Sequence, residues 1–197
     1  MASYALTCCS TADLTHEHFA ARDIQYACFH FTLNGETYPD DLGQSIPFPI
    51  FYQAMANGAE TSTSQVNISQ YLDLFTPILE SGKDILHVCL SSGLSGTYNM
   101  VRLQAGQRDD LEIAVFDSRS GSLGIGIMVL QLWEEIVAGA SWETLVRERA
   151  PHLVANTFPF FSVDTLEYLR RGGRIGRITA LAGTMLSIKP IITFSDD

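Results

Sequence analysis

Apolar and polar residues alternate along the chain in blocks that predict strands followed by helices. Nearly continuous apolar runs over residues 3–9, 84–90 and 111–116 are typical of strands in a parallel sheet that is covered on both faces. An aromatic-rich run over residues 26–33 predicts a further strand, and Asn34–Gly35 predicts a tight hairpin turn after it. The residues after that turn, Glu36 to Tyr38, are expected to form the returning strand.

Apolar residues spaced three and four apart predict the helices. The clearest pattern runs from Ile68 to Leu79, with Asn67 or Ser69 as its cap and Ser81–Gly82 at its end. The other predicted helices cover residues 48–56, 97–107, 123–137 and 142–155. The glycines between Gly121 and Gly126 fall inside an apolar helical pattern, so we expect them to permit close helix packing. They do not form a dinucleotide fingerprint after the first strand.

Strands and helices that alternate in this way predict an α/β fold with a parallel sheet and helices on both faces. The best domain boundary lies near Asn156–Pro159, which divides the chain into residues 1–157 and residues 158–197. The first part is expected to be an N-terminal α/β domain that carries the polar loops. The second is expected to be the start of a smaller α/β domain, because about forty residues cannot bury a core alone. Its predicted elements are a strand over 160–163, a helix from an Asp164 cap to Gly172–Gly173, a helix over 178–186 and a strand over 190–194.

Composition and charge exclude several classes of function. The hydrophobic content of 46% is enough for a packed core, and the formal net charge is −10. A chain of this charge repels nucleic acid and anionic membrane surfaces on average. Residues 1–11 do not form an export signal, and the apolar run over residues 125–130 is too short to span a bilayer. We therefore expect a cytoplasmic protein without a membrane span or a nucleic-acid partner.

The four cysteines are expected to be reduced core thiols. Cys8, Cys9, Cys28 and Cys89 form no C-x-x-C pair, and no histidine stands at a ligand spacing beside one of them. The sequence therefore predicts neither a metal site nor a cofactor.

Polar loops follow the predicted strands, where ligands bind in α/β folds. These stretches contain many hydroxyls and no histidine, and they cover Ser10–Thr11, Thr61–Gln65, Ser91–Thr97 and Asp117–Ser118. The loop that ends at Thr97 suits an anion, because its glycines allow backbone N–H groups to point inward and a helix begins after it. The hydroxyls of Ser92, Ser95 and Thr97 add donors, so a carboxylate can be held without a counter-charge.

Two other functions remain open for the same loop, besides simple capping of the helix. A serine-dependent acyl hydrolase would use Ser95, but Gly93 to Thr97 matches the G-x-S-x-G elbow only in part. Such an enzyme also needs a base beside the serine, and the nearest histidine in the sequence, His87, lies inside the preceding strand. The second alternative is a protein that binds a phosphate-containing ligand.

The stretch from Leu90 to Tyr98 resembles the signature loop of the DegV family of bacterial lipid-binding proteins. Other stretches resemble the family's motifs in the same order: Cys9–Leu14, Thr61–Gln65, Val115–Ser118, Leu166–Ile175 and Ile188–Pro190. Two positions differ, since Cys9 stands where the family usually has Asp, and Val66 replaces the proline of its T-S-Q-P loop. Family members also usually continue beyond the segment that matches Ile188–Pro190.

The resemblance implies a non-enzymatic protein that holds a long-chain fatty acid between two α/β domains. It implies that Thr63 and Ser95 bind the carboxylate, assisted by backbone N–H groups around Ser95 and Gly96. Ser64, Ser92 and Thr97 complete the set of candidate ligand-binding residues. We expect the apolar lining to come from Leu94, Ile125, Phe158, Phe160 and Phe161.

The resemblance also implies a partner, because in some bacteria such proteins present the acyl carboxylate to a fatty acid kinase. Arg170, Arg171, Arg174 and Arg177 form a basic cluster that either ends a helix in solvent or docks an acidic partner.

Overall fold

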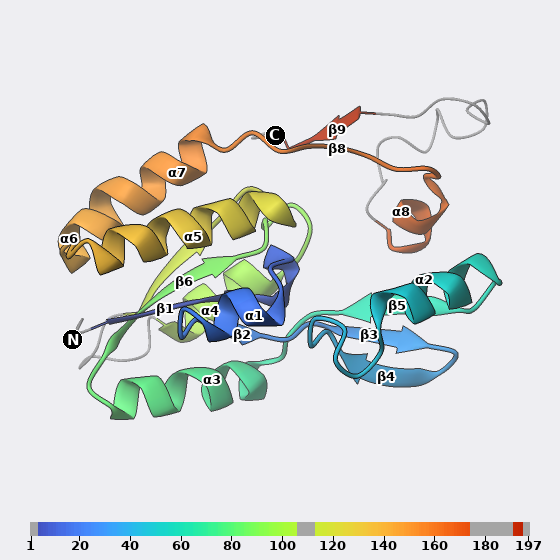
Figure 1. Ribbon diagram of the computed structural model, residues 1–197, viewed down its shortest axis with the longest axis horizontal. Helices are drawn as coiled ribbons and strands as arrows, with labels where there is room; N and C mark the ends of the chain where they lie inside the picture. Colours follow the sequence, from blue (N-terminus) through green and yellow to red (C-terminus); the bar gives the residue numbers. More distant parts are fainter. Residues whose placement is uncertain (1–3, 106–112, 174–190, 195–197) are drawn as a thin grey trace.

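Four parallel strands form the central sheet of the protein. The computed structural model describes residues 4–105, 113–173 and 191–194 (Figure 1). The strand order in the sheet is β2, β1, β6, β7, with bounds Gln25–Ala27, Tyr4–Cys9, Asp84–Cys89 and Ile113–Asp117. Neighbouring strands are all parallel, and the central pair aligns Thr7 with His87. The predicted parallel α/β architecture is therefore confirmed.

Helices cover both faces of this sheet, as predicted (Figure 1). Alternate side chains of the central strands point to opposite faces. Leu6 and Leu86 belong to a core with α5 (Leu123–Val137) and α7 (Ala150–Asn156). Cys9 and Ile85 belong to a second core on the other face, with α3 (Ile68–Glu80) and α4 (Thr97–Ala105). Because both faces are buried, the strands need the nearly continuous apolar sequence that identified them.

The prediction of one strand over residues 26–33 is wrong, because the chain changes sheets in the middle of that run. β2 belongs to the parallel sheet, whereas β3 (His30–Leu33) lies in an antiparallel sheet of order β4, β3, β5. Between them, the N–H of Phe29 donates to Ser10 Oγ at 3.1 Å, and its carbonyl accepts from the N–H of Asp40 at 2.8 Å. The backbone N–H and carbonyl of Phe29 thus bond to loop residues instead of to a neighbouring strand, which interrupts the strand at this point.

The small antiparallel sheet is joined by the predicted hairpin. Asn34 and Gly35 have φ angles of 50° and 89°, the left-handed conformations that this tight turn requires. β4 (Glu36–Pro39) returns beside β3, and β5 (Thr61–Ser64) pairs with the other edge of β3. The sequence did not predict β5, because its four hydroxyl residues lack the apolar alternation of a strand. Helix α2 (Phe48–Ala56) has the predicted bounds.

Most helix boundaries follow local capping chemistry. Asn67 caps α3 in a reciprocal capping box with Gln70, which decides between the two predicted caps. The segment predicted as one helix over 142–155 consists of α6 (Trp142–Thr144), a π-helical turn η2 (Leu145–Arg149) and α7. The short elements α1 (His16–Ala20) and the 3₁₀ turn η1 (Ser10–Ala12) precede β2.

The C-terminal segment contains a two-stranded antiparallel sheet of β8 (Phe160–Ser162) and β9 (Ile191–Thr193). Between them, α8 (Glu167–Arg171) begins after Leu166, so Asp164 is not its cap as predicted. The predicted helix over 178–186 lies outside the described residues, and the division of the chain at residue 157 stays a prediction. Within the described ranges, no helix has both the length and the apolar character needed to cross a membrane.

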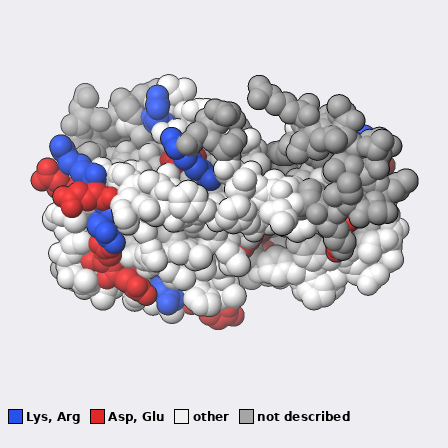
Figure 2. Space-filling model, turned by 90° about the horizontal axis from the view of Figure 1, so that it is seen from above, with Lys and Arg blue, Asp and Glu red and all other residues white. Residues whose placement is uncertain are grey.

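Charged side chains gather toward one end of the face that Figure 2 shows, where positive and negative groups stand side by side. The ion pairs of Arg149 with Glu135, and of Arg147 with Glu143, belong to α5 and the segment after it. Such mixed charges do not form the basic stripe that nucleic-acid binding needs.

Close packing of α5 against η1 depends on Gly126. A Cβ atom at this position would lie 2.7 Å from the carbonyl oxygen of Ala12 and 3.1 Å from Leu14 Cδ2. Replacing Gly126 with alanine should therefore destabilise the protein by about 1–3 kcal/mol, although alanine favours helices. Denaturant unfolding measures this free energy. Gly121→Ala is the matched control, because its Cβ would make only ordinary contacts of 3.5 Å or more; equal stability of the two variants would contradict the packing argument.

Candidate functional site

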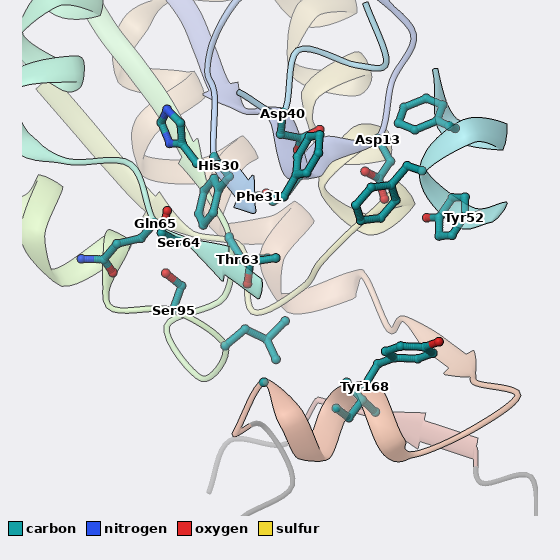
Figure 3. A pocket seen from close by; sticks show the side chains of 18 of the residues that line it. Asp13, His30, Phe31, Asp40, Tyr52, Thr63, Ser64, Gln65, Ser95 and Tyr168 are labelled. Carbon is teal, nitrogen blue, oxygen red and sulfur yellow. The ribbon is translucent and has the colours of Figure 1, made fainter. Parts of the chain in front are cut away.

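A cavity of about 1050 Å³ lies between the antiparallel sheet, α2, the loop before α4 and the segment that contains α8 (Figure 3). The carboxyl ends of β1 and β6 face it, since Thr11 and Leu90 line it just beyond those strands. This is the position expected for a ligand in an open parallel sheet. Its volume lies at the upper end of the range of about 300–1,000 Å³ that is usual for small-molecule sites.

Hydroxyl and amide groups form one end of the cavity. Thr63 and Ser64 on β5 line it together with Gln65, and Ser95 and Gly96 line it from the loop before α4. Figure 3 shows the side chains of Thr63 and Ser95 reaching toward the same open space. The pairing of β5 with β3 fixes this arrangement, because it sets Thr63 opposite Phe31. Four of the six predicted ligand-binding residues are thus brought together.

Ser95 is placed so that its hydroxyl proton is free to reach a ligand. Its Oγ accepts the N–H of Thr97 at 3.3 Å and lies 2.8 Å from Thr97 Oγ1. When the Thr97 hydroxyl donates across this contact, both bonds to Thr97 use Ser95 Oγ as acceptor. The Ser95 O–H can then donate into the cavity. Gly96 leaves its own backbone open there, with Gln65 Oε1 3.3 Å from where a Cβ would stand.

The structure places two predicted ligand-binding residues outside the cavity lining. Thr97 is fully buried and supports Ser95 through the contacts above. Ser92 is exposed, and its N–H donates to Asp117 Oδ1 at 3.1 Å. Its backbone therefore fastens the loop to the end of β7.

Aromatic side chains form a large part of the remaining lining of the cavity. They come mainly from β3, α2 and α8, and include Phe29, Phe31, Phe48, Phe51, Tyr52 and Tyr168. Of the five residues predicted to form the apolar lining, only Leu94 does so. Ile125, a residue of α5, is buried in the core, and Phe158 and Phe160 are mostly exposed. Phe161 instead packs near Phe194, with ring centroids 6.0 Å apart.

Acidic residues, and no basic ones other than His30, stand among the described residues that line the cavity. Burial raises the pKa of both Asp13 and Asp40, although hydrogen bonds from Ser122 and Ser10 oppose this. Gln70 Oε1 accepts from the N–H of Asn67, so its amide NH₂ is the group that faces His30 Nε2 at 2.9 Å. Among the described residues of the lining, the donors available to an anion are thus mainly neutral ones.

Several lining residues were missed by the sequence analysis. Gln65 lies inside the predicted Thr61–Gln65 stretch and could have been included on that ground. The aromatic residues of α2 gave no signal, because an amphipathic helix looks the same whether its apolar face meets a core or a cavity.

All four cysteines are free thiols, and Cys8, Cys9 and Cys89 are buried as predicted. Cys28 is only partly buried; burial, with the nearby charges of Asp40 and Asp41, raises its pKa to about 11. Cys9, His87 and Cys89 come together inside the protein, a grouping that the sequence did not predict.

The fold and the cavity define an α/β protein with a ligand-sized cavity that is hydroxyl-rich at one end and lined elsewhere by aromatic, aliphatic and acidic residues. The chain belongs to the DegV family, since the protein-family model described as "Uncharacterised protein, DegV family" matches residues 4–197 of its sequence. A DegV domain-containing protein of Staphylococcus aureus strain COL is 34% identical over 187 residues, which cover 95% of this chain. The chain spans 66% of the length of that relative.

Solved structures of similar fold include proteins that are described as binding fatty acids. A DegV family protein from Thermus thermophilus, described by its fatty acid binding, has a TM-score of 0.85 and 31% identity, over 98% of this chain and 68% of its own. DegV of Bacillus subtilis, described as a fatty acid binding protein, has a TM-score of 0.83 and 26% identity, over 100% and 69%. A stearic acid-binding protein from Eubacterium ventriosum has a TM-score of 0.81 and 27% identity, over 98% and 67%.

The raised pKa of Asp40 predicts a stability that depends on pH. The folded protein holds the proton of Asp40 more tightly than the unfolded chain does. The free energy of unfolding therefore falls as pH rises above about 4, which is the pKa of an aspartate side chain in an unfolded chain. Asp40→Asn removes this loss while keeping an acceptor for Ser10. Denaturant unfolding should therefore show the variant gaining stability over the parent chain more at neutral pH than at low pH. Asp73→Asn, on the exposed side of α3, controls for the loss of one charge; an identical pH response in both variants would refute the assignment.

Proposed function

We propose that this chain binds a long-chain fatty acid in the cavity and presents its carboxylate to a fatty acid kinase, without doing covalent chemistry itself. The observation that carries the proposal is that one cavity combines a hydroxyl-rich end with many aromatic and aliphatic side chains elsewhere in its lining. An amphipathic ligand with one small anionic head and an apolar tail matches both parts. The fatty acids named for the similar structures support the same choice.

Burial of the tail supplies most of the binding free energy. A tail of about fourteen methylenes gains roughly 11 kcal/mol when it leaves water, at about 0.8 kcal/mol for each. Association and ordering oppose this with about 4–15 kcal/mol. Tail burial is therefore required for useful affinity, and the polar end mainly fixes the orientation of the ligand.

The carboxylate is held by the hydroxyls of Thr63 and Ser95, with backbone N–H groups near Gly96 beside them. Thr63 and Gly96 are exposed and Ser95 is partly exposed, so the head of the ligand stays within reach of solvent. A kinase can then transfer a phosphoryl group from its nucleotide to the bound carboxylate oxygen. Arg170 and Arg171, at the end of α8, stand beside the cavity residues Gly172 and Gly173 and offer positive charge for docking. Arg174 and Arg177 of the predicted basic cluster lie outside the described residues.

The hydrolase alternative has less support. Ser95 Oγ contacts Thr97, and no histidine or carboxylate is hydrogen-bonded to it in the described part of the chain. A serine nucleophile needs such a base. A phosphate-containing ligand could use the same N–H and hydroxyl donors, but it would leave the aromatic remainder of the cavity unused.

The test of ligand binding is to purify the chain from cells, record its native mass and identify the lipid after denaturation. We expect one C14–C18 fatty acid per chain, a range that follows roughly from the tail free energies above. Thr63→Val and Ser95→Ala should each weaken the affinity for added fatty acid by roughly ten- to a hundredfold, the loss of one hydrogen bond to a charged group.

Two variants serve as matched controls for this experiment. Ser62→Ala removes a hydroxyl from β5, and Ser92→Ala removes one from the loop before α4; neither residue lines the cavity. Both should bind like the parent chain. Equal losses in all four variants, or a parent chain that neither carries nor takes up fatty acid, would contradict the proposed site. Tight competition by inorganic phosphate would favour the phosphate alternative, and ester turnover abolished by Ser95→Ala would favour the hydrolase.

Presentation of the carboxylate needs its own test. Fatty acid loaded on the chain should be converted to acyl phosphate by a bacterial fatty acid kinase and ATP faster than the same concentration of free fatty acid. Charge reversal of Arg170 and Arg171 should slow this conversion and leave fatty acid binding unchanged. Equal rates for free and bound fatty acid would contradict presentation and leave the binding proposal untouched.

A further inference from the structure

Two thiols and an imidazole meet inside the sheet, away from the cavity. Cys9 on β1 and His87 and Cys89 on β6 each place a potential ligand atom within 4.8 Å of the other two. All three side chains are fully buried. His87 Nε2 lies 3.8 Å from Cys9 Sγ. Tetrahedral zinc, with bonds of about 2.3 Å to sulfur and about 2.0 Å to nitrogen, would set sulfur and nitrogen roughly 3.6 Å apart. The Cys9–His87 pair therefore needs only a small contraction, and the other pairs need at most about 1 Å.

The strand register explains why these residues meet. Thr7 pairs with His87 and Cys8 with Val88 across the parallel β1–β6 ladder, so Cys9 stands beside Cys89 at its end. Residues two apart on a strand share a face. The backbone ladder at the centre of the sheet therefore holds the three ligand atoms in place, on the face that α3 covers.

The imidazole of His87 is oriented by its neighbours. Thr7 Oγ1 lies 2.8 Å from His87 Nδ1 and 3.5 Å from the carbonyl oxygen of Leu86. A threonine hydroxyl that donates to this carbonyl accepts the proton on Nδ1, which leaves the lone pair of Nε2 facing Cys9. The rings of Tyr71 and Phe75 stand edge-on to the imidazole, at centroid distances of 5.4 and 5.2 Å. Metal-binding histidines are oriented by hydrogen bonds of this kind.

The charges also suit a divalent ion in a buried place. Two thiolates and one neutral imidazole carry a charge of −2, which a divalent cation cancels, so the loaded site adds no net charge to the core. The Tyr71 hydroxyl lies 3.3 Å from Cys9 Sγ and can complete the surroundings of the ion or donate to the thiolate. A groove of about 250 Å³ between α3 and α4 is lined by Tyr71 and Phe75, so movement of these rings would open a route to the site.

We propose that Cys9, His87 and Cys89 form a buried binding site for Zn²⁺ or a similar thiophilic divalent ion. Soft thiolate ligands with imidazole select such ions over Mg²⁺ or Ca²⁺. Binding replaces the two thiol protons with the metal, so one ion enters and two protons leave. The ion would join the ends of β1 and β6, from which the chain runs directly to Thr11 and Leu90 at the cavity. The proposal departs from the sequence-based expectation that the chain has no metal site.

The test is a competition titration of the reduced, metal-free chain with Zn²⁺ against a chromogenic chelator. We expect one tight site per chain and a raised thermal midpoint when it is filled. Cys9→Ala and Cys89→Ala should each abolish the tight site. Cys8→Ala is the matched control, because it removes a buried thiol from the opposite face of β1. Thr7→Val should weaken binding by roughly ten- to a hundredfold, because it frees the imidazole to turn.

A measurement on the unchanged chain covers the case in which these variants do not fold. Co²⁺ in the site should give the sulfur-to-metal charge-transfer absorption of two coordinated thiolates, and Zn²⁺ should displace it. Failure to bind either ion, a Co²⁺ spectrum without this band, or tight Zn²⁺ binding that survives in both Cys9→Ala and Cys89→Ala would overturn the proposal. In each of these cases the three side chains would form a hydrogen-bonded core only.

Discussion

The parallel pairing of β1 with β6 is the interaction on which the rest of the molecule depends. It brings together residues that lie about eighty positions apart in the chain, and helices on both faces shield it from water. Because the two strands run in the same direction, both of their carboxyl ends open at one edge of the sheet. The loop that contains Thr11 and the loop that contains Ser95 thus meet at the cavity, and the thiols of the same strands meet behind it.

Neutral hydroxyl and amide groups, rather than basic side chains, form the described part of the polar end of the cavity. A basic residue there would bind a carboxylate strongly but would also hold other anions. Under the proposed function, neutral hydroxyls from Thr63 and Ser95 would be weaker donors, so affinity would depend on burial of the apolar tail against the apolar part of the lining. Under the same proposal, the carboxyl groups of Asp13 and Asp40 would oppose any bound anion, and burial of an apolar tail would have to offset this.

The sequence predicted those features that local chemistry determines. The apolar strands, the Asn67 cap and the Asn34–Gly35 turn were readable because each depends on neighbours in the chain. The division of residues 26–33 was not readable, because strand propensity does not reveal which sheet a strand joins. The strand β5 was missed because its hydroxyl residues lack apolar alternation, and the aromatic residues of α2 were missed because an amphipathic helix looks the same whether it faces a core or a cavity. Ser95 was readable as a donor of the polar loop, and Thr63 was singled out only through resemblance to a family, whereas the meeting of Cys9 with His87 needed the strand register itself.

The close approach of Gly126 to Ala12 has a consequence for how this protein can vary. Asp13 and Thr11, which line the cavity, flank the one carbonyl that Gly126 leaves room for. A side chain at position 126 would push this turn, and with it the cavity wall, although Gly126 is not itself among the residues that line the cavity. Position 126 is therefore constrained by the shape of the cavity wall as well as by the packing of α5.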